Sequence, residues 1–225
     1  MDTLHYEREF SLLKADISKM LSLVADSFEM SLSSLELIDP NLARKVLLLD
    51  DEIDAINREI EEKVYEIIAR YTPISKDLRY VITMIKFSNN LERIADLSCN
   101  VAEKTIDLYN NKQSYNMPKQ IKEMFGITLK MLHDTFLAFS KRDVELSKKI
   151  WFEDQKLDDI EIEIRGIVKG EKNCDILSVL IARDLERIGD HLTNLCEEII
   201  YIEKGEEIKK ILEGDKNEEN SDSGG

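Results

Sequence analysis

One helical motif occurs twice in this chain, and this repetition constrains the fold more than any other feature of the sequence. Residues 90–103 read NLERIADLSCNVAE, and residues 184–197 read DLERIGDHLTNLCE, with seven of the fourteen positions identical. Most identical positions are polar, so the repetition preserves more than a hydrophobic core. An offset of 104 residues extends the match upstream and aligns two acidic pairs, Asp50 with Asp154 and Asp54 with Asp158.

The second copy is the shorter one, because the motif itself needs an offset of only 94 residues. We place the shortening at 165–173, where a connection between helices tolerates deletion. The sequence therefore predicts a first repeat over 1–112, a second repeat over 113–205 and an acidic tail over 206–225. The tail ends in EGDKNEENSDSGG, which has too few apolar residues to offset the entropy of folding, and we expect it to be disordered.

Apolar residues recur at intervals of three and four along a chain with only three prolines and eight glycines. This spacing predicts amphipathic helices and an all-α fold. Asp39-Pro40 and Thr72-Pro73 each resemble a helix start, with a capping side chain before a proline in the first turn. The signals together predict six helices, three in each repeat, near residues 4–37, 40–70, 74–110, 117–140, 143–168 and 172–203.

Charge and composition exclude several classes of protein. The formal net charge of -15 opposes nucleic-acid binding, which depends on Lys and Arg displacing counterions from phosphates. The three cysteines have no CxxC spacing, so neither a disulfide framework nor a zinc knuckle is indicated. The first residues do not resemble a signal peptide, and no apolar run has the length of a membrane span. We therefore expect a cytoplasmic protein.

Each copy of the motif carries an acidic stripe on one helix face. At 100° per residue, four of its polar side chains project within an arc of about 80°. An acidic pair on the preceding helix would bring further carboxylates to the same place. Carboxylate and amide oxygens are hard ligands for Mg²⁺, Ca²⁺, Mn²⁺ or iron. The candidate metal ligands are Asp50, Asp54, Glu92, Asp96, Asn100 and Glu103 in the first repeat, and Asp154, Asp158, Glu186, Asp190, Asn194 and Glu197 in the second.

An ordinary solvated helix face is the alternative interpretation, with Arg93 and Arg187 forming surface ion pairs. Duplication argues against it. Surface charges should diverge first between two copies, yet Glu, Asp, Asn and Glu persist in register. The repeated stripes therefore favour cation binding.

The paired strings LERIAD and LERIGDH, each completed by Asn and Glu and preceded by D-x-x-x-D, resemble the PhoU family over residues 4–203. The resemblance implies two symmetrical three-helix bundles without catalytic activity. It also implies negative regulation of phosphate uptake and of the phosphate-starvation response. The implied partners are the ATPase of a Pst-type phosphate ABC transporter and a PhoR-type sensor histidine kinase, which would hold the protein at the inner face of the membrane. A homodimer is left open.

Metal binding in that family is carried by E(D)xxxD motifs, in some members as multinuclear iron clusters. Carried over, the motifs fall on Glu92/Asp96 and Glu186/Asp190, and on Asp50/Asp54 and Asp154/Asp158. Iron is therefore the expected ion, with Mg²⁺, Mn²⁺ or Ca²⁺ as alternatives. His191 stands where the first copy has Leu97, and we expect it outside the ligand set.

Two competing functions remain from the sequence alone. A ferritin-like di-iron protein, acting in iron storage or as an oxidoreductase, would also build its site in a helical bundle, but that class pairs Glu-x-x-His motifs that are missing here. A purely structural adaptor would leave the acidic faces solvated. Trp151 and Phe152, which align with Leu47 and Leu48, are expected in the core.

Overall fold

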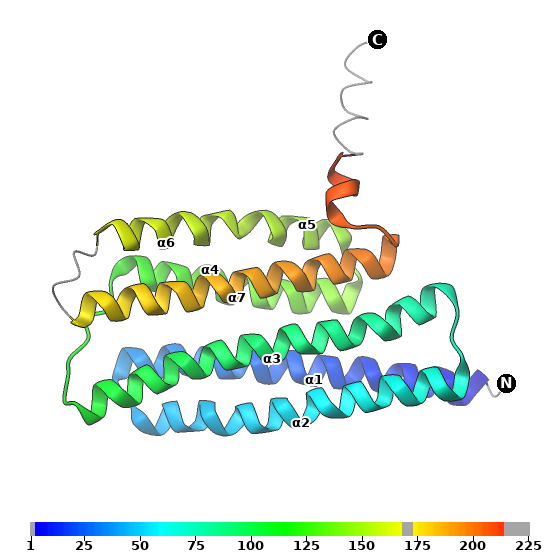
Figure 1. Ribbon diagram of the computed structural model, residues 1–225, viewed down its shortest axis with the longest axis horizontal. Helices are drawn as coiled ribbons and strands as arrows, with labels where there is room; N and C mark the ends of the chain where they lie inside the picture. Colours follow the sequence, from blue (N-terminus) through cyan, green and yellow to red (C-terminus); the bar gives the residue numbers. More distant parts are fainter. Residues whose placement is uncertain (1–2, 168–172, 214–225) are drawn as a thin grey trace, which may run out of the picture.

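The computed structural model describes residues 3–167 and 173–213, and these residues are helical without any strand. The all-α prediction is confirmed. Figure 1 shows the long helices running side by side in two groups, α1 to α3 and α4 to α7. Their bounds are α1 Thr3–Leu37, α2 Pro40–Tyr71, α3 Ser75–Asn110, α4 Lys119–Lys141, α5 Val144–Glu153, α6 Gln155–Ile167 and α7 Asn173–Lys204.

Capping side chains start the second helix of each half. Asp39 accepts a hydrogen bond from the backbone N–H of Asn41 at 2.8 Å, directly before the proline that opens α2. Asp143, at the equivalent position, accepts from the backbone N–H of Leu146 at 2.9 Å. The start signal at Thr72-Pro73 is wrong, because Thr72 ends α2 in the left-handed conformation and α3 begins at Ser75.

The fifth expected helix, 143–168, is divided in the structure, so the described residues contain seven long helices instead of six. The division falls at Asp154, whose backbone keeps right-handed helical angles, between α5 and α6. No proline or glycine lies there. The division coincides with the place where the Asp154 side chain meets the backbone of Gly189 on α7, and we attribute it to that close approach.

Apolar packing joins the two groups of helices. α1, α2 and α3 pack against one another, α7 packs against α4, α5 and α6, and α3 lies along α7. One continuous cluster of buried side chains includes residues from every helix from α1 to α7. The repeat boundary near 112 is therefore a boundary in the sequence and not a break in the core; its role as a domain boundary stays a prediction.

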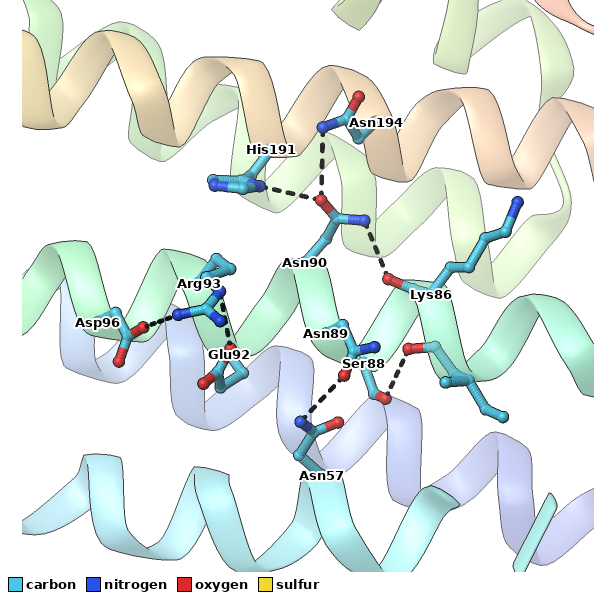
Figure 2. A network of polar contacts seen from close by, with 11 residues as sticks. Asn57, Lys86, Ser88, Asn89, Asn90, Glu92, Arg93, Asp96, His191 and Asn194 are labelled. Carbon is cyan, nitrogen blue, oxygen red and sulfur yellow. Dashed lines mark hydrogen bonds and ion pairs between the residues drawn. The ribbon is translucent and has the colours of Figure 1, made fainter. Parts of the chain in front are cut away.

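The contact between α3 and α7 is antiparallel and rich in polar pairs. Lys86 pairs with Glu198 at 3.2 Å, whereas Lys104, further along α3, pairs with Asp184 at 2.7 Å, near the start of α7. Between these two ion pairs, the amide oxygen of Asn90 lies 2.9 Å from Nδ1 of His191 and accepts from Asn194 at 3.4 Å (Figure 2). The two motif helices thus face each other across the middle of the molecule.

The expected tail, 206–225, is ordered over its first part. Residues 208–213 form a short helix in which Ile208 is only 2% exposed, because its apolar side chain has a surface to pack on. Residues 214–225 lie outside the described part of the chain, as do 168–172. Within the described ranges, no helix is both long enough and apolar enough to cross a bilayer.

Candidate metal centres

The first acidic cluster joins α2 to α3. Asp50 and Asp54 lie one turn apart on α2, and Glu92 and Asp96 lie one turn apart on the neighbouring face of α3. The Asp50 carboxylate is partly buried, and its Oδ1 atom has no hydrogen-bond partner. Burial, more than any charge, raises the pKa of Asp50, and the nearby carboxylates of Asp96 and Asp54 raise it further. These acidic groups therefore lie close enough to repel one another.

Glu92 belongs to the same cluster. Its pKa is raised first by burial and then by the charge of Asp96, whereas Arg93 lowers it. The Arg93 guanidinium lies 3.4 Å from Glu92 and donates to Asp96 at 2.8 Å, and Figure 2 shows it between the two carboxylates. One arginine thus offsets part of the negative charge of the first cluster.

A cleft of about 400 Å³ opens beside this cluster. Asn100 and Glu103 line it together with Asp50 and Asp96, so the structure brings four of the six expected first-repeat ligands to this cleft, whereas Asp54 and Glu92 do not line it. The Cys99 thiol also lines the cleft, and its pKa is raised by burial first and then by the Asp50 charge. The hydrogen bond of this thiol goes to the Val46 carbonyl oxygen at 3.9 Å, and the proximity of the thiol lowers the pKa of Asp50.

The second acidic cluster joins the α5–α6 junction to α7. Asp154 is partly buried, and its Oδ1 atom also has no hydrogen-bond partner. Its pKa is raised to about 7, first by burial and then by the charges of Asp158, Asp190 and Glu186. Asp154 is the repeat-equivalent of Asp50, so the same unusual atom occurs at the same place in both copies.

The remaining members of the second cluster follow the same pattern. Burial is the main cause that raises the pKa of Asp158 and of Glu186, and the charge of Asp190 raises both further. Glu161 adds to this repulsion from α6, where it is only 5% exposed and bonded to Arg165. Among the described residues, Arg187 of the second motif forms no ion pair with this cluster, in contrast to Arg93 in the first repeat.

The structure places three motif residues away from the second cluster's carboxylates. Asn194 is exposed, and its amide contacts Asn90 on α3. His191 also contacts Asn90 and faces α3. Glu197 accepts a hydrogen bond from the indole N–H of Trp151 at 3.1 Å. The second stripe is therefore divided between an acidic cluster and contacts to other helices.

A glycine makes the two clusters unequal. A Cβ atom at Gly189 would collide with Asp154 Oδ1 and with a methyl group of Leu157. The first repeat has Ala95 at the equivalent position, fully buried. Asp154 can therefore lie close to the backbone of α7 at Gly189. In the first repeat, the Cβ of Ala95 prevents an equally close approach of Asp50 to α3, so the second cluster is the more compressed one.

The arrangement is acidic but not a finished metal site. Over residues 3–167 and 173–213, no group of three or more His, Cys, Asp or Glu side chains is positioned to hold an ion as it stands. Repulsion between carboxylates would keep them apart in the absence of a cation. The donor set is oxygen-rich, and the two partnerless buried oxygens fit hard cations better than zinc.

Sequence reasoning missed several features of these sites. The cysteine spacing, which indicates neither a disulfide framework nor a zinc knuckle, gives no sign that Cys99 lines the first cleft. Glu161 has no acidic counterpart in the first repeat, where Asn57 stands. The expected burial of Trp151 and Phe152 is wrong: Trp151 is partly exposed and Phe152 is 57% exposed. The alignment misled because it pairs Phe152 with Leu48, and Leu48 is itself 68% exposed, which only the structure shows.

Comparisons with known proteins all identify the same family. The family model described as the PhoU domain matches residues 17–105 and 121–199. A Thermotoga maritima protein named phosphate-specific transport system accessory protein PhoU homolog 1 is 53% identical over 95% of both chains. The Escherichia coli phosphate-specific transport system accessory protein PhoU is 28% identical, over 92% of this chain and 88% of its own.

Solved structures show the same fold. The crystal structure of PhoU from Pseudomonas aeruginosa superposes with a TM-score of 0.84 at 27% identity, covering 89% of this chain and 100% of that one. The phosphate transport system regulatory protein PhoU from Streptococcus pneumoniae gives a TM-score of 0.80 at 26% identity, covering 89% and 98%.

The raised pKa of Asp154 predicts how stability depends on pH. A folded-state pKa of about 7, above the usual value of about 3.9, means that the native protein binds more protons than the unfolded chain between these values. Asp154 should therefore lower the free energy of unfolding as pH rises from 4 to 7. In chelator, Asp154→Asn should lose less stability than wild type over this interval in denaturant titrations, while the exposed control Asp26→Asn follows wild type. Equal losses of stability in all three proteins would contradict the raised pKa of Asp154.

Gly189→Ala tests the compression of the second cluster. The added methyl group should displace Asp154 and Leu157 and lower the free energy of unfolding by about 1–3 kcal/mol, the usual cost of overpacking. Gly126→Ala is the matched control, because a Cβ there meets no atom within 4 Å, and it should be neutral or add up to about 1 kcal/mol. Urea titration measures both. A Gly189→Ala protein as stable as the control would show that the contact is not tight.

Proposed function

The chain belongs to the PhoU family, and from this membership we propose that it is a non-enzymatic accessory protein of phosphate-specific transport. In this role it restrains phosphate uptake and the phosphate-starvation response by docking to the ATPase of a Pst-type transporter and to a PhoR-type sensor histidine kinase. The names of its relatives in Thermotoga and Escherichia support the transport role, since both match over most of their length. The partners themselves are part of the proposal.

We also propose that each acidic cluster binds cations. The observation that carries this proposal is the pair of equivalent atoms, Asp50 Oδ1 and Asp154 Oδ1, each buried without a partner among other carboxylates. Buried polar atoms of this kind normally have a partner. Their occurrence at the same position of both repeats is better explained by a shared ligand than by two independent packing defects.

The residues fit hard ions. Asp50, Asp54, Glu92 and Asp96 would hold a cation in the first repeat, and Asp154, Asp158, Glu186 and Asp190 would do so in the second. A bound ion supplies positive charge, which removes the repulsion and ties neighbouring helices together. Iron in multinuclear clusters is the proposed occupant, with Mg²⁺, Mn²⁺ or Ca²⁺ as alternatives, because each accepts carboxylate oxygens.

The ferritin-like alternative gains no support. His133 lies 3.2 Å from Glu29 and His191 is bonded to Asn90, and neither histidine has the glutamate three residues before it that the Glu-x-x-His motif of that class requires. Nucleic-acid binding is opposed by the net charge of -15. We propose a location in the cytoplasm, at the inner face of the membrane through the partners.

Docking to the transporter tests the proposed role. Tagged protein should retain the ATPase of the host's phosphate transporter from solubilised membranes, and deletion of its gene should raise expression of phosphate-starvation genes at high phosphate. An unrelated ABC transporter ATPase in the same membranes is the control. No retention together with unchanged gene expression would contradict the proposal.

Metal content tests the acidic clusters. Asp50→Asn and Asp154→Asn each keep the shape of the side chain but remove one charge, so each should lose the metal of its own repeat only. Mass spectrometry of the purified proteins should give about half the wild-type content for each variant, and the exposed control Asp26→Asn should match wild type. Full metal content in both variants would rule out these sites.

A further inference from the structure

Two arginines that occupy equivalent positions in the repeats line one cleft. Arg93 on α3 and Arg187 on α7 both border the cleft of about 400 Å³ beside the first acidic cluster. Arg93 is the arginine of the LERI string in the first motif, and Arg187 is the arginine of the same string in the second. The antiparallel contact of α3 with α7 therefore brings the two arginines to one cleft.

The two arginines differ in their partners. Arg93 is held by Glu92 and Asp96. Arg187 is exposed and forms no ion pair with any residue in the described part of the chain. His191 lies near both, since after burial the charge of Arg187 is the next cause that lowers its pKa, and Arg93 lowers it as well. The cleft therefore contains one arginine that is neutralised by carboxylates, Arg93, and one without an anionic partner among the described residues, Arg187.

The same cleft also contains acidic side chains. Asp50, Asp96 and Glu103 line it, and in the absence of cations they would repel an anion and keep Arg93 occupied. Cations on the carboxylates would remove that repulsion and compete with Arg93 for Glu92 and Asp96. The cleft would then present positive charge from two arginines and from the ions.

We propose that this cleft binds inorganic phosphate through Arg93 and Arg187 once the first acidic cluster holds its cations. Guanidinium groups are planar donors that bind phosphate with two parallel hydrogen bonds. The inference rests on the proposed metal binding and extends it: the ligand is a tetrahedral oxyanion, and its site lies at the junction of the two repeats. Occupancy would link α3 to α7 across that junction.

Equilibrium dialysis with labelled inorganic phosphate tests the proposal. The full chain is loaded with Mn²⁺, freed of excess ion, and its metal content is measured before dialysis. Arg187→Gln removes the unpaired guanidinium and should weaken phosphate binding about tenfold at unchanged metal content. Arg70→Gln is the matched control, because Arg70 is also an exposed arginine but lies 20 residues from Asp50 along α2, about 30 Å away; it should bind like wild type.

Two results would overturn the proposal. Equal phosphate affinity of Arg187→Gln and wild type would show that the anion is held without Arg187. No phosphate binding by wild-type protein with measured metal would show that the cleft takes no oxyanion. Failure of the proposed metal binding would appear separately, as protein that takes up no Mn²⁺ before any phosphate is added.

Discussion

Repulsion between carboxylates at a helix contact is the constraint on which the rest of this structure depends. In each repeat, acidic side chains from two neighbouring helices extend the face that packs, where burial raises their pKa values. Such an arrangement destabilises the folded chain unless protons, arginines or cations neutralise it. Arg93 supplies part of that neutralisation in the first repeat. The second repeat leaves Asp154 with a pKa of about 7, and it therefore depends more on an added positive charge.

The position of these clusters links them to the architecture. The motif helices α3 and α7 carry carboxylates toward their own repeats and also contact each other through Asn90, His191 and the Lys104–Asp184 ion pair. A change of charge in one cluster therefore occurs only a few residues along the helix from the contact of α3 with α7. We expect ion binding to stiffen this contact and so to give the proposed partners a defined surface.

Much of the fold could be predicted from the sequence, because apolar spacing and caps are local signals. Asp39-Pro40 gave the start of α2 correctly, whereas Thr72-Pro73 did not, since Thr72 ends a helix and the chain turns before α3. The division of α5 from α6 has no local signal; it depends on the contact of Asp154 with Gly189 on a distant helix. The partial order of the expected tail likewise depends on a packing surface for Ile208.

The candidate site was predictable to a similar degree. The repeat identified the acidic positions, and the structure brings Asp50, Asp96, Asn100 and Glu103 to one cleft. Helical periodicity could not show that Asn194 contacts α3 or that Glu197 bonds Trp151, because these choices are made by neighbouring helices. The asymmetry created by Gly189 and the convergence of Arg93 with Arg187 also required the three-dimensional arrangement.

The most direct test of the central claim is a crystal structure of the protein grown with Mn²⁺, with anomalous scattering used to locate the ions. The account predicts anomalous peaks within bonding distance of Asp50 Oδ1 and of Asp154 Oδ1, with carboxylates from the adjoining helix on the same ions. Peaks confined to other surfaces, with both aspartates turned into bulk water, would contradict it.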